Sequence, residues 1–159
     1  MPRNSTLPRR RRRSAGIYCL LLATAAALAE AQETPHPTDT TDTAAVRQVL
    51  LDAYVSGVHV ERDTAAVRAG FHPDFVMLVD DAGRLLSISL DDWLDRMQLD
   101  GVPTSDIIRH EFRAVDVTED AAMAVLEIYE NGVHIYTDYF SLYRFTDGWR
   151  IVSKIFHGH

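Results

Sequence analysis

The spacing of hydrophobic and polar residues divides the chain into helical segments followed by a strand-rich part. Residues 43 to about 59, 64 to about 69 and 91 or 92 to about 99 repeat hydrophobic positions at helical spacing. From residue 107 onward, hydrophobic and polar residues alternate, as they do in half-buried strands. The strands predicted from this alternation and from two shorter runs are 75–79, 85–89, 107–118, 121–130, 133–145 and 149–156.

Turn signals connect these predicted strands in sequence. Asp81-Ala82-Gly83 joins the two short strands, and Glu119-Asp120, Asn131-Gly132 and Thr146-Asp147-Gly148 join the four long ones. Asn131-Gly132 is the strongest signal, because both residues tolerate the positive φ of a type I′ turn. Helices grouped before long sequential strands predict an α+β fold, in which the helices cover one face of a strongly curved antiparallel sheet.

The turns also predict which residues share a face of the sheet. A two-residue turn at Asn131-Gly132 pairs Glu130 with Val133, which places Val125 opposite Asp138. We expect the concave face to combine aromatic rings with isolated titratable groups, as a ligand cavity does. The residues predicted on it are His110, Phe112, Ala114, Met123, Val125, Glu127, Tyr129, Tyr136, Asp138, Phe140 and Leu142.

The partner of Asp138 on the last strand depends on the final turn. A two-residue turn places His157 opposite Asp138, whereas a three-residue turn brings Lys154 to a diagonal position on the same face. Either neighbour would give a buried carboxylate the partner that it needs. The sequence leaves both arrangements open.

Two motifs carry a family resemblance. Residues 136–157 read YTDYFSLYRFTDGWRIVSKIFH, and residues 71–75 read FHPDF. With the order of elements, they resemble the "putative lumazine-binding" branch of the NTF2-like superfamily, which has the cone-shaped fold of ketosteroid isomerase and SnoaL-type cyclases. The resemblance covers about Thr43 to His157 and implies a pocket for a small molecule. The family label implies a heteroaromatic ligand, although no residue here selects a pteridine ring.

Asp138 is the first candidate for chemistry. It is either a general acid/base or a structural ion pair. His72 stands in a turn before a proline, where packing and capping are its expected roles. Tyr54 and Trp93 lie on hydrophobic helix faces and could close the pocket. The predicted pocket residues are Tyr54, His72, Trp93, His110, Glu127, Tyr136, Asp138, Lys154 and His157.

The first 31 residues predict a cleavable export signal. They combine an arginine run at 9–13, a hydrophobic stretch at 15–29 and a small-x-small cleavage site ending at Ala31. Residues 32–42 are rich in Pro, Thr and Asp and predict a disordered linker. The domain is then residues 43–159. We expect a periplasmic or secreted protein with no membrane segment in its mature form.

Cleavage after Ala31 also changes the charge. The leader holds 6 of the 16 Lys and Arg residues and 1 of the 23 Asp and Glu residues, so the remainder carries 10 − 22 = −12. This acidity argues against a nucleic-acid partner, which requires a basic face. The only cysteine, Cys19, lies in the leader, so the mature chain has no disulfide.

The sequence therefore supports three functional hypotheses. The first is an exported domain, expected to be a homodimer, that binds a small, partly aromatic molecule in its cone. The second is a cofactor-independent isomerase or dehydratase in which Asp138 acts as the base and Tyr54 or Tyr136 as a hydrogen-bond donor. The third is a non-catalytic dimerisation or interaction module. No metal-ligand spacing or cofactor motif is found, so we expect neither a metal nor a cofactor.

Overall fold

The computed structural model describes residues 40–159. The predicted leader at 1–31 and residues 32–39 of the predicted linker lie outside the described residues. The helical elements are α1 (Thr40–Val49), the π-helical segment η1 (Leu50–Val60), α2 (Thr64–Gly70) and α3 (Leu90–Met97). The strands are β1 (Phe71–Asp81), β2 (Arg84–Ser89), β3 (Ile108–Thr118), β4 (Ala121–Glu130), β5 (Val133–Phe145) and β6 (Gly148–Gly158).

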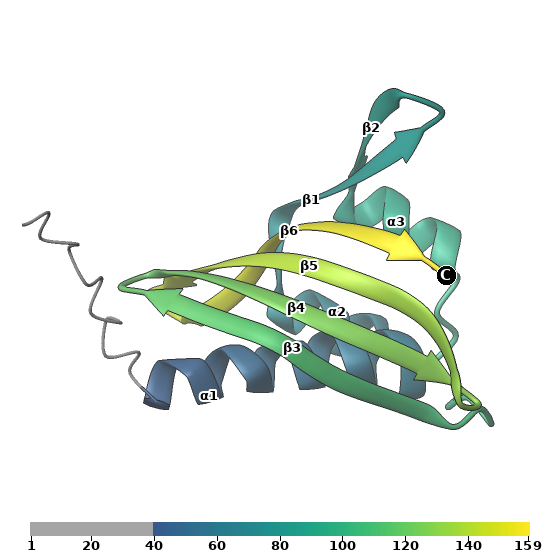
Figure 1. Cartoon of the computed structure of the whole chain (residues 1–159), viewed down its shortest axis with the longest axis horizontal. Coiled ribbons are helices and arrows are strands. Elements are labelled where there is room, and N and C mark those ends of the chain that lie inside the picture. Colours follow the sequence, from purple (N-terminus) through teal and green to yellow (C-terminus); the bar gives the residue numbers. More distant parts are fainter. Residues whose placement is uncertain (1–39) are drawn as a thin grey trace, which may run out of the picture. The chain divides into compact units, whose positions relative to one another are not determined.

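The strands form one curved, open sheet in the order β2-β1-β6-β5-β4-β3. Figure 1 shows β3 to β6 bending together beside α1, with the β1–β2 hairpin at the opposite edge of the sheet. The predicted α+β class and curved sheet are confirmed. The sheet is mixed, however, because β1 and β6 pair in parallel. No hairpin turn links these two strands, so their relative direction is not fixed by a short connection.

Local capping explains where the shorter helices begin and end. The Asp63 carboxylate accepts a hydrogen bond from the Ala65 amide at 2.8 Å at the start of α2. The Ser89 hydroxyl accepts one from the Asp92 amide at 3.1 Å, so α3 begins at Leu90. Gln98 ends α3 in the left-handed conformation, with φ of 48°. These caps position the helix that carries Trp93.

Helix α1 begins three residues earlier than the sequence predicts. Thr40, Thr41 and Asp42 were expected in the linker, but they form its first turn. The Asp42 carboxylate accepts two hydrogen bonds from Arg144, at 2.8 and 3.0 Å, and one from the Trp149 indole at 3.3 Å. The beginning of α1 is therefore attached to β5 and β6.

The hydrophobic core lies between the helices and the concave face of the sheet. Val46, Leu50 and Tyr54 come from the helical side and are at most 1% exposed. The facing side chains of β4 are Ala122, Ala124, Leu126 and Ile128, all buried. Helix α2 packs closely on η1, because a Cβ atom at Gly70 would overlap that of Ala53. The core thus fixes η1 against the sheet.

Three β-bulges change the predicted registers. The turn pairing Glu130 with Val133 is confirmed, but Ile135 is an extra residue on β5, so Asp138 lies opposite Leu126 instead of Val125. Arg113 is a second extra residue, on β3, and places Phe112 opposite Leu126 rather than Glu127.

Each bulge reverses the face of the residues beyond it. Met123, Val125, Glu127 and Tyr129 therefore lie on the outer face of β4, contrary to the prediction. Ala114, opposite Val125, lies on that face too. Tyr136, Asp138, Phe140 and Leu142 share the concave face, as predicted, with the even-numbered residues of β4.

The last turn follows neither predicted alternative completely. It is a two-residue turn in which Phe145 pairs with Gly148, but Val152 is an extra residue on β6. Lys154 consequently lies opposite Phe140 and diagonal to Asp138, while His157 lies opposite Thr137 on the outer face. The partner of Asp138 is therefore Lys154. Among the described residues, no helix is long and hydrophobic enough to span a membrane.

Candidate functional site

Three buried polar side chains from different elements meet under the helices. Tyr54 of η1 donates a hydrogen bond to Asp138 Oδ2 at 2.8 Å, and Lys154 Nζ donates one to Tyr54 Oη at 2.7 Å. Lys154 Nζ also lies 2.7 Å from Asp138 Oδ1. The Lys154 side chain is 5% exposed and that of Asp138 is 0% exposed. We call these residues the buried trio; they join η1, β5 and β6.

Both oxygens of Asp138 are engaged within the buried trio. Oδ2 accepts from Tyr54, and Oδ1 faces the Lys154 ammonium as an ion pair outside hydrogen-bond angles. Asp138 is not among the side chains that line the adjacent cavity. The carboxylate consequently acts on Tyr54 and Lys154, and does not reach a molecule in the cavity directly.

Aromatic rings surround the Lys154 ammonium. Its Nζ lies 4.5 Å from the centre of the Tyr54 ring and 4.9 Å from that of Phe156. The rings of Trp93, Tyr136 and Phe140 are centred 5.7 to 5.8 Å away. Aromatic faces attract a cation through their quadrupole, and more strongly where water is excluded. These rings and Asp138 together compensate the burial of the ammonium.

A cavity of about 180 Å³ opens beside the buried trio. It lies among η1, β1, α3, β5 and β6. Its lining residues are Tyr54, Val58, His59, Met77, Trp93, Met97, Tyr136, Lys154 and Phe156. Phe156 is 36% exposed and Met97 is half-buried, whereas Tyr54 and Trp93 are buried. The exposed side chains mark the side from which a ligand would enter.

Burial and the ion pair determine the charges of the trio. Desolvation lowers the pKa of Lys154, and the nearby Asp138 carboxylate opposes that shift. Burial, followed by the charge and hydrogen bond of Asp138, raises the pKa of Tyr54 well above its usual value. Tyr54 therefore remains a neutral hydroxyl that donates to Asp138, and the trio contains one cation and one anion.

His59 is a cavity residue that the sequence analysis missed. Desolvation, with a smaller effect from the Lys154 charge, lowers its pKa from 6.5 to about 4. Its Nε2 is buried and has no hydrogen-bond partner within the described part of the chain. The α-helical spacing did not place His59 with Tyr54. A π-helix bonds residue i to i+5, so residues 54 and 59 lie about one turn apart, and their rings are centred 4.9 Å apart.

Four of the nine predicted pocket residues line the cavity: Tyr54, Trp93, Tyr136 and Lys154. His72 does not. It lies in β1, where its Nδ1 accepts a hydrogen bond from the Asp74 amide at 3.1 Å and its ring stacks on Phe145 with a centroid distance of 4.7 Å. These contacts match the packing and capping role that was expected for it.

The remaining predicted residues lie away from the cavity. His110 lies opposite Ile128 on edge strand β3 and is exposed. Glu127 is on the outer face, where it accepts hydrogen bonds from Arg113 at 2.7 Å and Tyr129 at 2.8 Å. These two bonds lower the Glu127 pKa against its desolvation, with the Tyr129 bond having the largest effect. His157 is exposed and contacts His159 edge to face.

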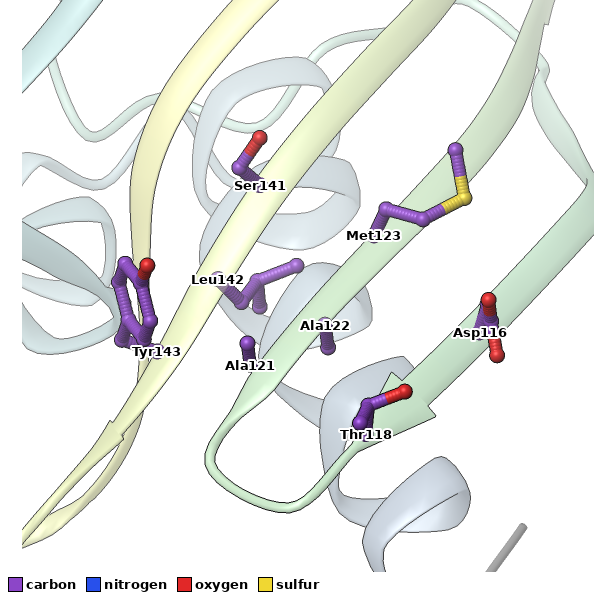
Figure 2. Close-up of a pocket in the computed structure, with 8 residues that line it drawn as sticks. All are labelled: Asp116, Thr118, Ala121, Ala122, Met123, Ser141, Leu142 and Tyr143. Atoms are coloured by element: carbon purple, nitrogen blue, oxygen red, sulfur yellow. The ribbon is translucent and has the colours of Figure 1, made fainter. Parts of the chain in front are cut away.

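A larger hollow of about 320 Å³ lies over β3, β4 and β5 (Figure 2). Met123, Ser141 and Asp116 line it, and Figure 2 shows the helices behind these strands. Asp116 is its only charged side chain and is exposed. Because no buried polar group points into this groove, the smaller cavity is the better candidate site. Residues 40–159 contain no group of three or more His, Cys, Asp or Glu that could hold a metal ion.

Solved structures place the fold in the NTF2-like class. An NTF2-like protein of unknown function from Shewanella baltica OS155 is 22% identical, with a TM-score of 0.64, covering 77% of this chain and 97% of that one. Another, from Silicibacter pomeroyi DSS-3, is 23% identical, with a TM-score of 0.61 and coverages of 73% and 94%. A structure described as a putative dehydratase of the NTF2-like family, from Streptomyces avermitilis, is 19% identical, with a TM-score of 0.55 and coverages of 75% and 96%.

The sequence also identifies the family. Residues 41–157 match the family described as "putative lumazine-binding", and the chain belongs to it. No curated protein matches the sequence. The structural neighbours are all below 25% identity, so they establish the fold alone.

The depressed pKa of His59 predicts a pH dependence of stability. Unfolding returns its pKa from about 4 to about 6.5, so between these values the unfolded chain binds more protons than the folded one. The free energy of unfolding therefore falls as the pH falls through this window. Allowing for partial exposure, we expect His59 to contribute about 1–3 kcal/mol to this loss.

Urea unfolding of the wild type and His59→Phe, from about pH 7 to pH 4, measures this contribution. The wild type should lose more stability than the variant. His157→Phe, the same change at an exposed histidine, is the matched control and should follow the wild type. Equal pH slopes for the wild type and His59→Phe would contradict a buried neutral imidazole.

Proposed function

We propose that the chain is an exported domain that binds one small, partly aromatic molecule in the cavity beside the buried trio. The observation that carries this proposal is the cavity of about 180 Å³, whose wall combines aromatic rings with the Lys154 ammonium. Ligand sites are typically hydrophobic hollows with a few convergent polar groups, and this cavity has that composition. Membership of the family described as "putative lumazine-binding" supports a heteroaromatic ligand.

The roles of the lining residues follow from their positions. Trp93, Tyr136 and Phe156 offer ring faces and edges for stacking, which would supply most of the affinity. Lys154 carries three N–H donors, of which the oxygens of Tyr54 and Asp138 engage at most two. The remaining donor would orient a hydrogen-bond acceptor on the ligand.

Binding is better supported than proton transfer by Asp138. A general base must come within hydrogen-bond reach of the proton that it removes. Asp138 does not line the cavity, and its two oxygens already contact Tyr54 and Lys154. The Asp138 carboxylate therefore has a positioning role in this proposal, and Tyr54 donates to it instead of to the ligand.

Export is supported by the sequence of the first 31 residues. The arginine run, hydrophobic stretch and small-x-small site match a secretory signal, and residues 1–39 lie outside the described part of the chain. N-terminal sequencing of the protein from its own host should begin at Gln32. A chain that retains its first 31 residues would contradict the proposal.

A homodimer is the assembly that the outer face of the sheet supports best. Val125, Tyr139 and Ile155 lie side by side across β4, β5 and β6. Tyr139 is 43% exposed and Ile155 is 50% exposed. The next row contains Glu127, Thr137 and His157, so a hydrophobic centre has a polar rim.

A second copy suits this face for electrostatic reasons. Glu111 and the ion pair of Glu127 with Arg113 place acidic and basic groups on the same rim. A two-fold axis would bring the rim of one copy against that of the other and the hydrophobic rows together. We propose this isologous contact in place of a heterologous partner.

The dimer proposal predicts the effect of one charge at the centre of the face. Tyr139→Glu would bring two carboxylates together in a hydrophobic contact and should weaken dimerisation at least tenfold. Analytical ultracentrifugation measures the dissociation constant. Leu85→Glu is the control, because Leu85 is 68% exposed in β2, away from this face. A wild type that stays monomeric at high concentration would contradict the dimer.

The binding proposal predicts that filling the cavity abolishes binding. Val58 lines the cavity and is 3% exposed, so the larger ring in Val58→Phe should occupy the ligand volume. With benzamide and lumazine as probes, ligand-detected NMR should show binding to the wild type and an affinity at least tenfold lower for the variant.

Val102→Phe provides the matched control, because it makes the same change at a residue that is 61% exposed and outside the cavity lining. It should bind both probes as the wild type does. If neither probe binds the folded wild type, the proposed function is wrong. Equal binding by the wild type and Val58→Phe would move the site elsewhere.

A further inference from the structure

The cavity contains a cation that is already neutralised. Lys154 is the only lining residue with a permanent charge, and Asp138 lies 2.7 Å from its Nζ, directly behind the cavity wall. Tyr54 is held neutral in its hydroxyl form, and His59 is held neutral as an imidazole. The buried groups that face the cavity therefore have a net charge of zero.

This balance determines which ligand charge the cavity accepts. A bound carboxylate would introduce a second anion beside Asp138, for one ammonium. An uncompensated buried charge costs several kcal/mol because it loses its hydration. A neutral ligand brings no such cost and still receives a hydrogen bond from the ammonium, which is stronger than one from a neutral donor.

Two polar positions remain available to a ligand. The first is the donor of Lys154 that the trio does not use. The second is His59 Nε2, which is buried without a partner in the described part of the chain. Both residues line the cavity, and the Lys154 charge is close enough to lower the pKa of His59. Tyr54 Oη is not available, because it already donates to Asp138 and accepts from Lys154.

The volume limits the size of the molecule. A protein cavity of roughly 150 Å³ lined by hydrophobic residues holds benzene. The cavity here is about 180 Å³, so it has room for one ring with a small substituent before any side chain moves. The rings of Trp93, Tyr136 and Phe156 favour a flat molecule.

We infer that the cavity selects an uncharged, planar ring compound with a carbonyl-type acceptor next to a second polar group, and that it rejects the corresponding carboxylate. The acceptor would meet Lys154 and the second group His59. The inference rests on the proposed function, since it names the class of ligand for the same cavity. It also reverses the simplest expectation for a lysine-containing pocket, which is an anionic ligand.

Benzamide and benzoate test this inference, because they share a ring and nearly the same shape but differ in charge at pH 7. Titration of each probe into the wild-type protein, followed by NMR of the Trp93 indole, should give at least tenfold tighter binding of benzamide. In His59→Phe, benzamide should bind about fivefold or more weakly, because the second polar contact is lost. Benzoate affinity should change little in this variant.

Asp138→Asn tests the charge argument directly, because it leaves Lys154 without its counter-ion in a side chain of almost the same shape. Benzoate should then bind at least tenfold tighter than it binds the wild type. If this variant does not fold, the comparison in the wild type decides the matter. Benzoate binding as tightly as benzamide there would overturn the inference and leave the proposed function intact, whereas binding of neither probe would remove both.

Discussion

The ion pair between Asp138 and Lys154 is the interaction on which the rest of the site depends. Its atoms are 2.7 Å apart and the two side chains are 0% and 5% exposed. Neither charge would be stable there alone, because a single buried ion costs several kcal/mol. Tyr54 completes the arrangement by donating to one residue and accepting from the other. Through it, η1 is held to β5 and β6, and the floor of the cavity is fixed.

The same interaction determines the chemistry of the cavity. The carboxylate is behind the wall and keeps the Lys154 ammonium oriented, and five aromatic rings surround that ammonium. A polar donor is thereby presented in a hydrophobic hollow without a net charge. His59 adds a neutral imidazole nitrogen. Together these features favour recognition of a neutral ligand over acid/base chemistry by Asp138.

The sequence predicted much of the fold and the centre of the site. The class, the turns and the pairing of Glu130 with Val133 follow from hydrophobic periodicity and turn chemistry, and both are local properties. Asp138 was placed on the concave face because its alternation with Phe140 persists within β5. Lys154 was one of its two expected partners.

The remaining errors have specific structural causes. Glu127 was assigned to the wrong face because the extra residue Ile135 shifts β4 against β5 by one position. The extra residue Val152 likewise moves His157 to the outer face and leaves Lys154 next to Asp138. His59 was missed because the chain continues as a π-helix, for which α-helical spacing gives the wrong neighbours. Bulges and π-helical turns depend on tertiary packing, so they left no local signal in the sequence.

A double-mutant cycle of Asp138→Asn and Lys154→Met, followed by urea unfolding, tests the buried ion pair most directly. Each single change leaves an unmatched buried polar or charged group and should lower the free energy of unfolding by about 3–5 kcal/mol. The double variant should lose clearly less than the sum of the two, because neither charge then remains. Additive losses, or single variants as stable as the wild type, would show that the two charges are not coupled and would contradict the account.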